Sequence, residues 1–402
     1  MENNKNKILN VPTLRFKEFN EEWEQHLFKD VFIIKNGLNK EKEFFGKGIP
    51  IINYMDVNKN TNITLDIIKG LVDLSPSEVN IFKIEKGDIL FTRTSETSEE
   101  IGLSASVIEN LPNTVFSGFL LRARPNMEVF DEIYSGYYFR SPGLRKEIIK
   151  HSSITTRALT SGYLLNQLSI RVPSIDEQKK IGALFRGIDS RIKIQRKLID
   201  SYKSLIMGLI DVEFSDTHNI FVPLGKSLIE VSNRNKLLQN LKVLSVSNTQ
   251  GFINQTDQFD GRNIASENTS NYKIVSKGDF AYNPARINVG SISRLKHIER
   301  GIISPMYVCF KVVEASFYAE YFDWFLKSTR FRKELITKLE GSVRQVLSFN
   351  DLTTIKLAVQ SKEQQMMFTR FLNAINFYNE LNLKTLKKLI KLKTALASKM
   401  FI

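Results

Sequence analysis

The sequence is poor in cysteine and contains no long apolar run. Its single cysteine, Cys309, excludes an internal disulfide and a cysteine-based zinc site. Because Cys309 stands in the apolar run Tyr307–Phe310, we expect a small buried core residue there. The longest apolar runs, such as Val31–Ile34, are far too short to span a bilayer. The first residues also lack the apolar core of a secretory signal, so the sequence predicts a soluble, cytoplasmic protein.

Motifs of catalysis are missing as well. The four histidines are isolated and show no metal-ligand spacing. Gly225–Ser227 is not a phosphate loop, because Ile220 stands where the first glycine belongs. Asn283–Pro284 is followed by Ala285, which disagrees with the Asn-Pro-Pro-aromatic loop of amino-methyltransferases. We therefore expect no catalytic residue, no metal and no cofactor in this chain.

Acidic residues are fewer than basic ones. The 402 residues include 57 Lys and Arg against 43 Asp and Glu, which gives a net charge of +14. This excess favours a polyanionic partner, either nucleic acid or an anionic membrane surface, over a basic but unspecialised surface. The length suggests two or three domains, and the hydrophobic content of 42% is ample for their cores.

The chain repeats itself over about half its length. Glu177-Gln178 and Glu363-Gln364 each open an amphipathic helix, and the offset between them is 186. Lys86-Gly87-Asp88 matches Lys277-Gly278-Asp279, and the segment from Tyr134 to Ile148 matches the segment from Tyr321 to Leu335, in the same order. A repeat this long predicts a duplicated domain, each copy followed by a long helix, and two similar surfaces for a partner.

The two helices have coiled-coil spacing and are expected to pair with each other. The first seam runs at intervals of four and three with one polar member, Gln195, which either fixes the register or lies at a frayed, exposed position. The second seam slips between Tyr378 and Leu386, which predicts a four-residue stutter in the second helix. The predicted seam positions are Ile181, Phe185, Ile188, Ile192, Ile199, Tyr202, Ile206, Phe371, Ile375, Tyr378, Leu386, Leu389 and Leu396.

The order of these parts resembles the specificity subunit of type I restriction–modification enzymes over nearly the whole chain. The segment Pro12–Phe19 is similar to the opening of that family, and the two Lys-Gly-Asp strands are similar to its strand-and-turn signature. Val172-Pro173 ahead of Glu177-Gln178 resembles the start of its central helix. The distal copy departs from this pattern, with Gln360 in the place of Pro173.

The resemblance implies an α+β fold with pseudo-twofold symmetry. Two similar mixed α/β target-recognition domains would be joined by two long antiparallel coiled-coil helices. The expected domains are residues 1–173 for the first recognition domain, 174–212 for the central helix, 213–359 for the second recognition domain and 360–402 for the distal helix.

The resemblance also implies a function without catalysis. Each domain would read one half of a bipartite site in double-stranded DNA, while two methyltransferase subunits and the motor-nuclease subunits would dock on the helices. S-adenosylmethionine, ATP and Mg would belong to those partners, which would methylate adenine and cleave DNA.

Base readout needs donors and acceptors on loops, and arginine suits guanine as asparagine and glutamine suit adenine. The candidates follow the Gly-Asp strands or precede the long helices, and for each one a phosphate contact or a plain surface position is the alternative. They are Arg93, Thr94, Ser95 and Arg157 in the first half and Asn283, Arg286, Arg344 and Gln345 in the second.

Two other functions compete with this interpretation. One is a coiled-coil scaffold with duplicated ligand-binding domains and no role in DNA binding, against which the basic charge argues mildly. The other is a methyltransferase fused to its own reader, which no cofactor-loop motif supports. Salt-dependent binding to duplex DNA separates the first alternative from the DNA reader, and S-adenosylmethionine binding by the isolated chain tests the second.

Overall fold

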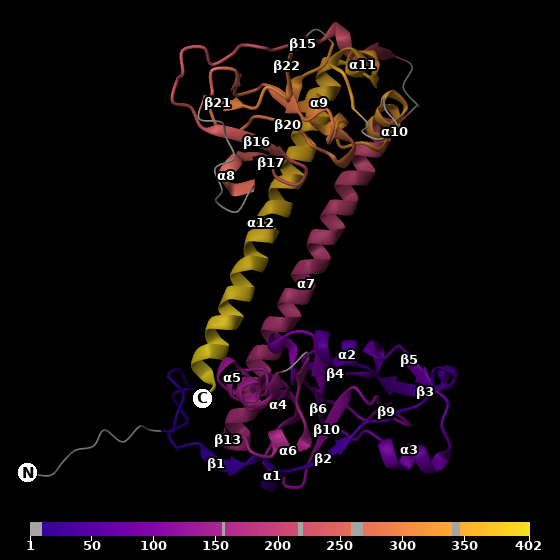
Figure 1. Ribbon diagram of the computed structural model, residues 1–402, viewed down its shortest axis with the longest axis vertical. Helices are drawn as coiled ribbons and strands as arrows, with labels where there is room; N and C mark the ends of the chain where they lie inside the picture. Colours follow the sequence, from indigo (N-terminus) through magenta and orange to yellow (C-terminus); the bar gives the residue numbers. More distant parts are fainter. Residues whose placement is uncertain (1–9, 155–156, 216–219, 259–267, 315, 340–345) are drawn as a thin grey trace, which may run out of the picture. The chain divides into compact units, whose positions relative to one another are not determined.

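The chain folds into two compact mixed α/β units. The computed structural model describes residues 10–154, 157–215, 220–258, 268–314, 316–339 and 346–402. Unit 1 comprises Met1–Arg196 and Lys384–Ile402, and unit 2 comprises Lys197–Leu383. The two long helices are α7 (Ile175–Glu213) and α12 (Lys362–Met400), of 39 residues each (Figure 1). Each helix begins in one unit and ends in the other. Unit 1 holds the start of α7 and the end of α12, so the helices run antiparallel and the predicted fold class is confirmed.

Unit 1 is built on a five-stranded sheet of order β2-β10-β6-β8-β4, in which only the β4–β8 pair is parallel. A smaller sheet, β5-β3-β9, a sheet β11-β12-β7 and an antiparallel pair β1–β13 complete it. The strands are β1 (Glu24–Leu27), β2 (Phe32–Asn36), β3 (Phe45–Ile52), β4 (Asn62–Ile63), β5 (Gly70–Val72), β6 (Ile89–Thr92), β7 (Thr94–Ser95), β8 (Ser104–Val107), β9 (Val115–Phe116), β10 (Leu120–Pro125), β11 (Ser153–Ile154), β12 (Ala158–Leu159) and β13 (Ser169–Val172). Its short helices are α1 (Phe28–Val31), α2 (Tyr54–Lys59), α3 (Pro76–Phe82), α4 (Glu132–Tyr138), α5 (Pro142–His151) and α6 (Gly162–Leu165).

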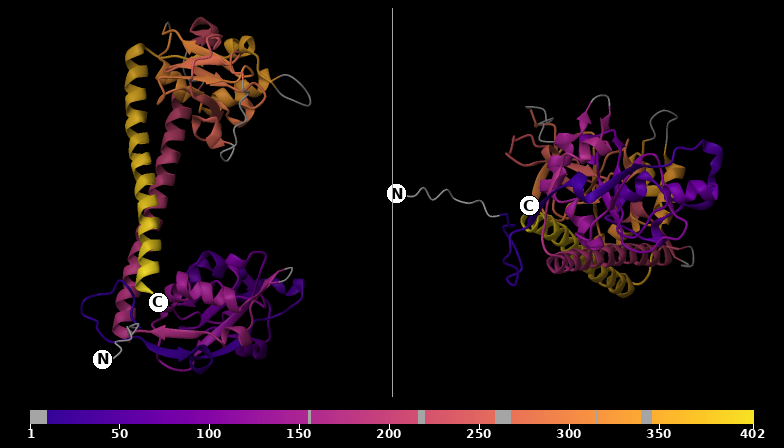
Figure 2. Two further views of the ribbon diagram at one scale, coloured as in Figure 1. Left: turned by 60° about the vertical axis from the view of Figure 1, so that its left-hand side comes forward. Right: turned by 90° about the horizontal axis from the view of Figure 1, so that it is seen from below.

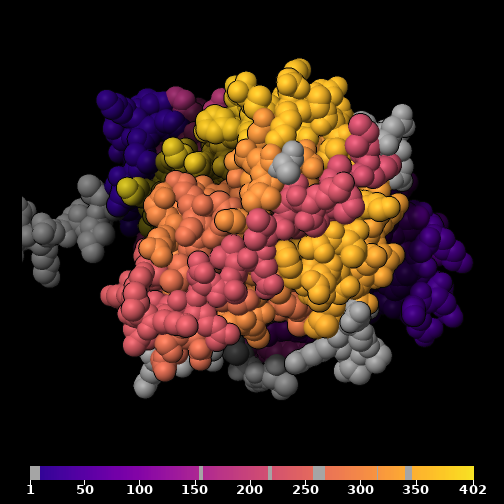
Figure 3. All heavy atoms as spheres, turned by 90° about the horizontal axis from the view of Figure 1, so that it is seen from above, coloured from indigo at the N-terminus to yellow at the C-terminus, as the bar shows by residue number. Residues whose placement is uncertain are grey.

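Unit 2 repeats this plan with one strand fewer in its main sheet, whose order is β15-β22-β19-β20. These strands correspond, in the same order, to β2, β10, β6 and β8 of unit 1. A second sheet, β17-β16-β21-β18, corresponds to β5-β3-β9, and the pair β14–β23 corresponds to β1–β13. Figure 3 shows the surface of this unit from above. The strands are β14 (Phe221–Pro223), β15 (Leu228–Glu230), β16 (Val243–Ser247), β17 (Gly251–Asn254), β18 (Lys273–Ser276), β19 (Phe280–Tyr282), β20 (Ile292–Arg294), β21 (Arg300–Ile303), β22 (Val308–Val312) and β23 (Lys356–Ala358). Its short helices are α8 (Gln255–Gln258), α9 (Ala319–Phe325), α10 (Thr329–Lys338) and α11 (Phe349–Thr354).

The repeated Lys-Gly-Asp sequence forms the same turn in both units. Gly87 and Gly278 adopt φ values of 90° and 98°, a left-handed conformation that favours glycine. The Asp88 carboxylate accepts a 2.7 Å hydrogen bond from the main-chain N–H three residues back, and Asp279 accepts the equivalent bond at 2.8 Å. The motif therefore closes the turn that leads into β6 or β19, which is a structural role.

A buried glutamine fixes the start of each long helix. In unit 1 the Gln178 amide donates to the carbonyls of Val129 and Pro173 at 2.8 and 2.9 Å, and its oxygen accepts from the Asp131 N–H at 2.9 Å. In unit 2 Gln365 makes the same three bonds, to Ser316, Gln360 and Tyr318. Each partner in this second set is related to its counterpart by a constant offset of 187. The helix starts therefore match as Gln178 with Gln365, and the offset of 186 expected from Glu363-Gln364 is wrong by one position.

Each hydrophobic core receives a phenylalanine from the end of a long helix. Phe401 follows α12, and its ring lies 5.7 Å from Tyr134 and 5.4 Å from Phe185, centroid to centroid, in unit 1. Phe214 follows α7, and its ring lies 4.9 Å from Tyr321 in unit 2. Phe214 and Phe401 are again related by the offset of 187. Each core is thus completed by a segment distant in sequence.

Every position predicted for the α7 seam, Gln195 included, is buried or half-buried. The predicted α12 seam is wrong in its first half. Phe371 and Tyr378 are 55% and 54% exposed, whereas Leu372 is buried and Ile375 is 9% exposed. From Gln365 to Met400 the buried or half-buried positions recur at alternating intervals of three and four, and they include Leu386, Leu389 and Leu396. No stutter interrupts α12, and both helices run as uninterrupted ribbons in Figure 2.

The single cysteine is a core residue, as its sequence context predicts. Cys309 lies on β22 with no exposed surface, among Leu244, Ala281 and Ile303. Burial raises the pKa of its thiol to about 12. An unionised, inaccessible thiol of this kind is chemically inert.

Candidate nucleic-acid interface

The structure brings the four predicted readers of unit 1 together. Arg93 follows strand β6, and Thr94 and Ser95 form β7, which pairs with β12. Arg157 immediately precedes β12 and is exposed. The Thr160 N–H donates to the Arg93 carbonyl at 3.0 Å and ties the two segments together. Ser95 is only 6% exposed, and its hydroxyl accepts from the Thr97 N–H at 3.2 Å, which favours a role in shaping the loop.

The two described candidates of unit 2 occupy the equivalent place. Asn283 follows β19, and Arg286 is exposed three residues later. The Leu347 N–H donates to the Pro284 carbonyl at 3.3 Å, which corresponds to the Thr160–Arg93 bond of unit 1. Arg344 and Gln345 lie outside the described residues.

The two candidates of unit 2 differ in availability. Asn283 is 8% exposed, and its side-chain oxygen accepts from the Ala285 N–H at 3.1 Å, so this side chain is committed to the turn. Arg286 projects from the surface instead. Within the described part of the chain, neither Arg157 nor Arg286 forms an ion pair with a carboxylate. Each unit thus presents an exposed guanidinium group with no carboxylate partner among the described residues, suited to a phosphate or a base edge.

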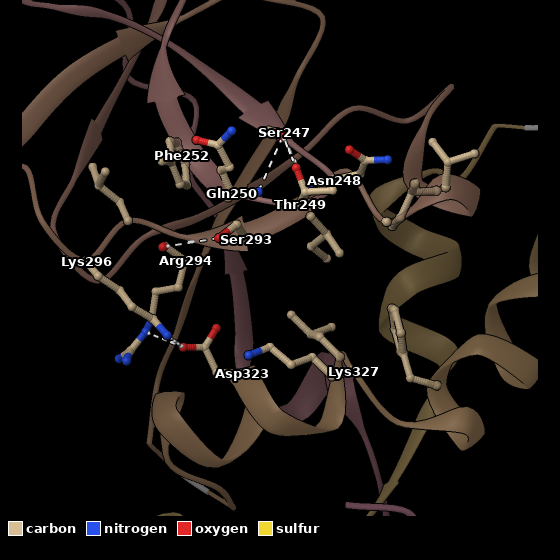
Figure 4. Close-up of a pocket in the computed structure, with 18 of the residues that line it drawn as sticks. Ser247, Asn248, Thr249, Gln250, Phe252, Ser293, Arg294, Lys296, Asp323 and Lys327 are labelled. Carbon is tan, nitrogen blue, oxygen red and sulfur yellow. Dashed lines mark hydrogen bonds and ion pairs between the residues drawn. The ribbon is translucent and has the colours of Figure 1, made fainter. Parts of the chain in front are cut away.

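Beside Arg286, unit 2 carries an open groove of about 920 Å³ that the sequence did not indicate. The β16–β17 turn, with Asn248 and Gln250, lies across the groove from Asp323 and Lys327, and Arg294 of β20 lies between them (Figure 4). A smaller hollow that includes Arg286 and Asn248 adjoins it. The groove is therefore continuous with the predicted reading surface.

Charge inside the groove is partly compensated. Arg294 bonds to Glu320 at 2.5 Å and to Asp323 at 3.0 Å, and Lys296 reaches Asp323 at 2.7 Å. Burial raises the pKa of Glu320, but the hydrogen bond and the positive charge of Arg294, together with smaller contributions from its own backbone and Lys296, leave that pKa below its ordinary value. Lys327 lies 4.2 Å from the centre of the Trp324 ring. Arg332 has no carboxylate partner among the described residues. The two cations of the groove that remain available are therefore Lys327 and Arg332.

Neither a metal centre nor a membrane segment emerges from the residues described. No cluster of three or more histidine, cysteine, aspartate or glutamate side chains there is arranged to hold a metal ion. Among the same residues, every helix is too short or too polar to cross a bilayer.

Known proteins match the chain at the level of sequence. Residues 20–202 match the family described as type I restriction modification DNA specificity domain. The putative type I restriction enzyme MjaX specificity subunit of Methanocaldococcus jannaschii is 23% identical over 415 residues, which cover 94% of this chain and 92% of that protein. The type I restriction enzyme EcoKI specificity subunit of Escherichia coli is 28% identical over 151 residues, or 37% of this chain and 32% of that protein.

Solved structures share the fold along nearly the whole length. The S subunit of the type I restriction–modification system from M. genitalium has a TM-score of 0.61 at 16% identity and covers 98% of this chain and 99% of its own. A chain from a study of complex assembly and conformational transition of the type I R-M system has a TM-score of 0.55 at 14% identity, with 94% and 97% covered.

Residues 20–202 thus match a type I restriction modification DNA specificity domain, and the main sheet of unit 2 repeats the strand order of unit 1 with one strand fewer. Along most of its length the chain is therefore similar to specificity subunits of type I restriction–modification enzymes.

Proposed function

We propose that this chain directs a type I restriction–modification complex to a bipartite DNA sequence, with one unit reading each half-site. The observation that carries the proposal is the equivalence of the two units, down to the same three hydrogen bonds around Gln178 and Gln365. A duplicated reader suits a split site, and the net charge of +14 suits a polyanion.

We further propose that the chain is not an enzyme by itself. Methyltransferase and motor-nuclease subunits would bring S-adenosylmethionine, ATP and Mg, and the complex would act on DNA in the cytoplasm. The predicted domain boundaries belong to this proposal, with α7 and α12 acting as the spacer between the readers.

An outward apolar stripe on each long helix supports docking of two methyltransferase subunits. On α12, Met367, Phe371 and Tyr378 are 72%, 55% and 54% exposed and lie on one helix face. On α7, Leu205 and Val212 are 49% and 73% exposed at heptad spacing. Exposed apolar stripes of this kind mark surfaces for a partner helix.

Binding to duplex DNA tests the proposal. A reader that neutralises several phosphates should lose affinity on the order of a thousandfold between 50 and 200 mM salt. Fluorescence anisotropy with labelled duplexes, run with the chain alone and with its complex, measures this slope. Binding that is absent, or that ignores salt, would favour the scaffold without a DNA role.

Replacing Arg286 with alanine should relax base discrimination in the second half-site only. One arginine–base contact contributes about 1–3 kcal/mol of discrimination, roughly tenfold to a hundredfold in relative affinity. Competition binding with duplexes altered in one half-site at a time measures the loss, and Arg300→Ala, an exposed arginine on β21, is the matched control. An equal loss for all duplexes would make Arg286 a phosphate contact.

A further inference from the structure

The main sheets of the two units differ at one edge. In unit 1 the segment Asn53–Lys69 leaves β3, forms α2 and adds β4 as a fifth strand beside β8. The Ser106 N–H of β8 donates to the Thr61 carbonyl at 3.0 Å. The Arg140 guanidinium holds the same segment by donating to the carbonyls of Asn58 and Asn60, at 3.2 and 2.9 Å.

Unit 2 keeps the groups that bind this segment, but its described residues include no counterpart of α2 and β4. Arg294 opposes Phe280 as Ser106 opposes Ile89, so its main chain faces the sheet edge that β4 occupies in unit 1. Helices α9 and α10 match α4 and α5 at the same offset of 187, which puts Lys327 in the place of Arg140. The turn Asn248–Gln250, which joins β16 to β17, has only three residues and cannot supply a strand.

The edge of β20 that corresponds to the β4 side of β8 lies inside the groove already described. All three residues of β20 line the groove, and Ile292 and Arg294 direct main-chain groups away from β19. Lys327 and Arg332 add cationic donors from the neighbouring helices. The Ile292 N–H already donates to the Gly290 carbonyl at 2.8 Å, which leaves the Arg294 N–H as the edge donor without a main-chain partner among the described residues. A strand edge with an open donor is a template for another chain.

We propose that an extended polypeptide segment of the subunit that docks on α7 and α12 enters this groove and pairs with β20 as a fifth strand. Its main-chain carbonyls would bond to the Arg294 N–H and to the Lys327 ammonium, as Thr61 and Asn60 bond in unit 1. The inference rests on the proposed function, because it needs partner subunits. A strand is favoured over a nucleic acid because the edge of β20 offers main-chain groups at the spacing of a polypeptide backbone.

Hydrogen exchange of the full-length chain tests the inference in three samples: chain alone, chain with duplex DNA and chain assembled with its methyltransferase subunit. The Arg294 amide should gain protection of at least about tenfold in the assembled complex and none with DNA alone, whereas the Ile292 and Leu295 amides already donate to Gly290 and Asp279. Protection by DNA alone would assign the groove to nucleic acid and overturn the inference. An assembled complex with an unprotected Arg294 amide would overturn it too, while leaving the proposed function intact.

A charge-matched pair of variants supplies the second measurement. Lys327→Ala should weaken association with the methyltransferase subunit roughly tenfold, because an ammonium–carbonyl bond is lost. Lys333→Ala removes the same charge from the exposed face of α10, outside the groove, and should have no effect. If both variants weakened association equally, Lys327 would act only through its contribution to the overall charge, and its proposed bond in the groove would be wrong. Failure of the chain to bind either DNA or partner subunits would sink the proposed function and this inference together.

Discussion

Replacing Phe401 with alanine is expected to destabilise unit 1 by about 4 kcal/mol, because it leaves a phenylalanine-sized cavity in a closed core. The side chain is 7% exposed and packs against Tyr134, Tyr138 and Phe185. The loss should be confined to the unit that receives Phe401. Denaturant unfolding combined with hydrogen exchange, which reports on each unit separately, measures it.

Two other phenylalanines supply the controls for this experiment. Phe214→Ala should cost a similar free energy but in unit 2, because Phe214 is fully buried there against Tyr321. Phe371→Ala should change stability by no more than about 0.5 kcal/mol, because that ring is 55% exposed. If Phe401→Ala loosened unit 2, or left unit 1 unchanged, the account of the two cores would be wrong.

The repeat and the α7 seam were predictable because both are local patterns. Ile181, Phe185, Ile188 and Ile192 recur at one helical face, and periodic apolar positions report burial directly. The matched Lys-Gly-Asp sequences were equally visible, although their role in closing a turn needed the structure.

The α12 seam escaped prediction because polar residues occupy it. Asn379 is 8% exposed, and Lys393 lies in the seam with its ammonium 2.6 Å from the Asp189 carboxylate in unit 1. A seam predicted from apolar residues alone therefore selects Phe371 and Tyr378, which lie on the exposed face of the helix. A constant offset of 187 from the α7 seam would have found the correct positions.

Less of the candidate interface could be predicted. Arg93 and Arg157 converge as expected, since one follows the Gly-Asp strand and the other precedes the strand that pairs with β7. Residue type alone does not reveal that the Asn283 side chain is hydrogen-bonded inside a turn, whereas the Arg286 side chain is exposed. The groove borders the edge of β20, where the described residues of unit 2 have no counterpart of β4, and sequence motifs do not report a missing neighbour.

Lengthening both long helices by one turn is expected to lengthen the spacer between the half-sites and to leave the half-sites unchanged. Four residues inserted after Gln195 in α7 and after Asn382 in α12 fall at equivalent positions, because these two residues are related by the offset of 187. They add about 6 Å and rotate the following residues by about 40°. One or two base pairs, at about 3.4 Å and 36° each, match that change. Methylome sequencing of cells carrying the altered complex reads the spacer directly, and an unchanged spacer would rule out a ruler role.

The same insertion in α7 alone is the decisive control. Each unit needs one end of both helices, because Phe214 completes the core of unit 2 and Phe401 that of unit 1. With only one helix lengthened, the two phenylalanines cannot both reach their cores while Lys393 keeps its bond to Asp189. The single insertion should therefore lower the free energy of unfolding by several kcal/mol, as loss of a core phenylalanine does, whereas the paired insertion should not. Equal stability of the two variants would mean that the helices do not act as one spacer.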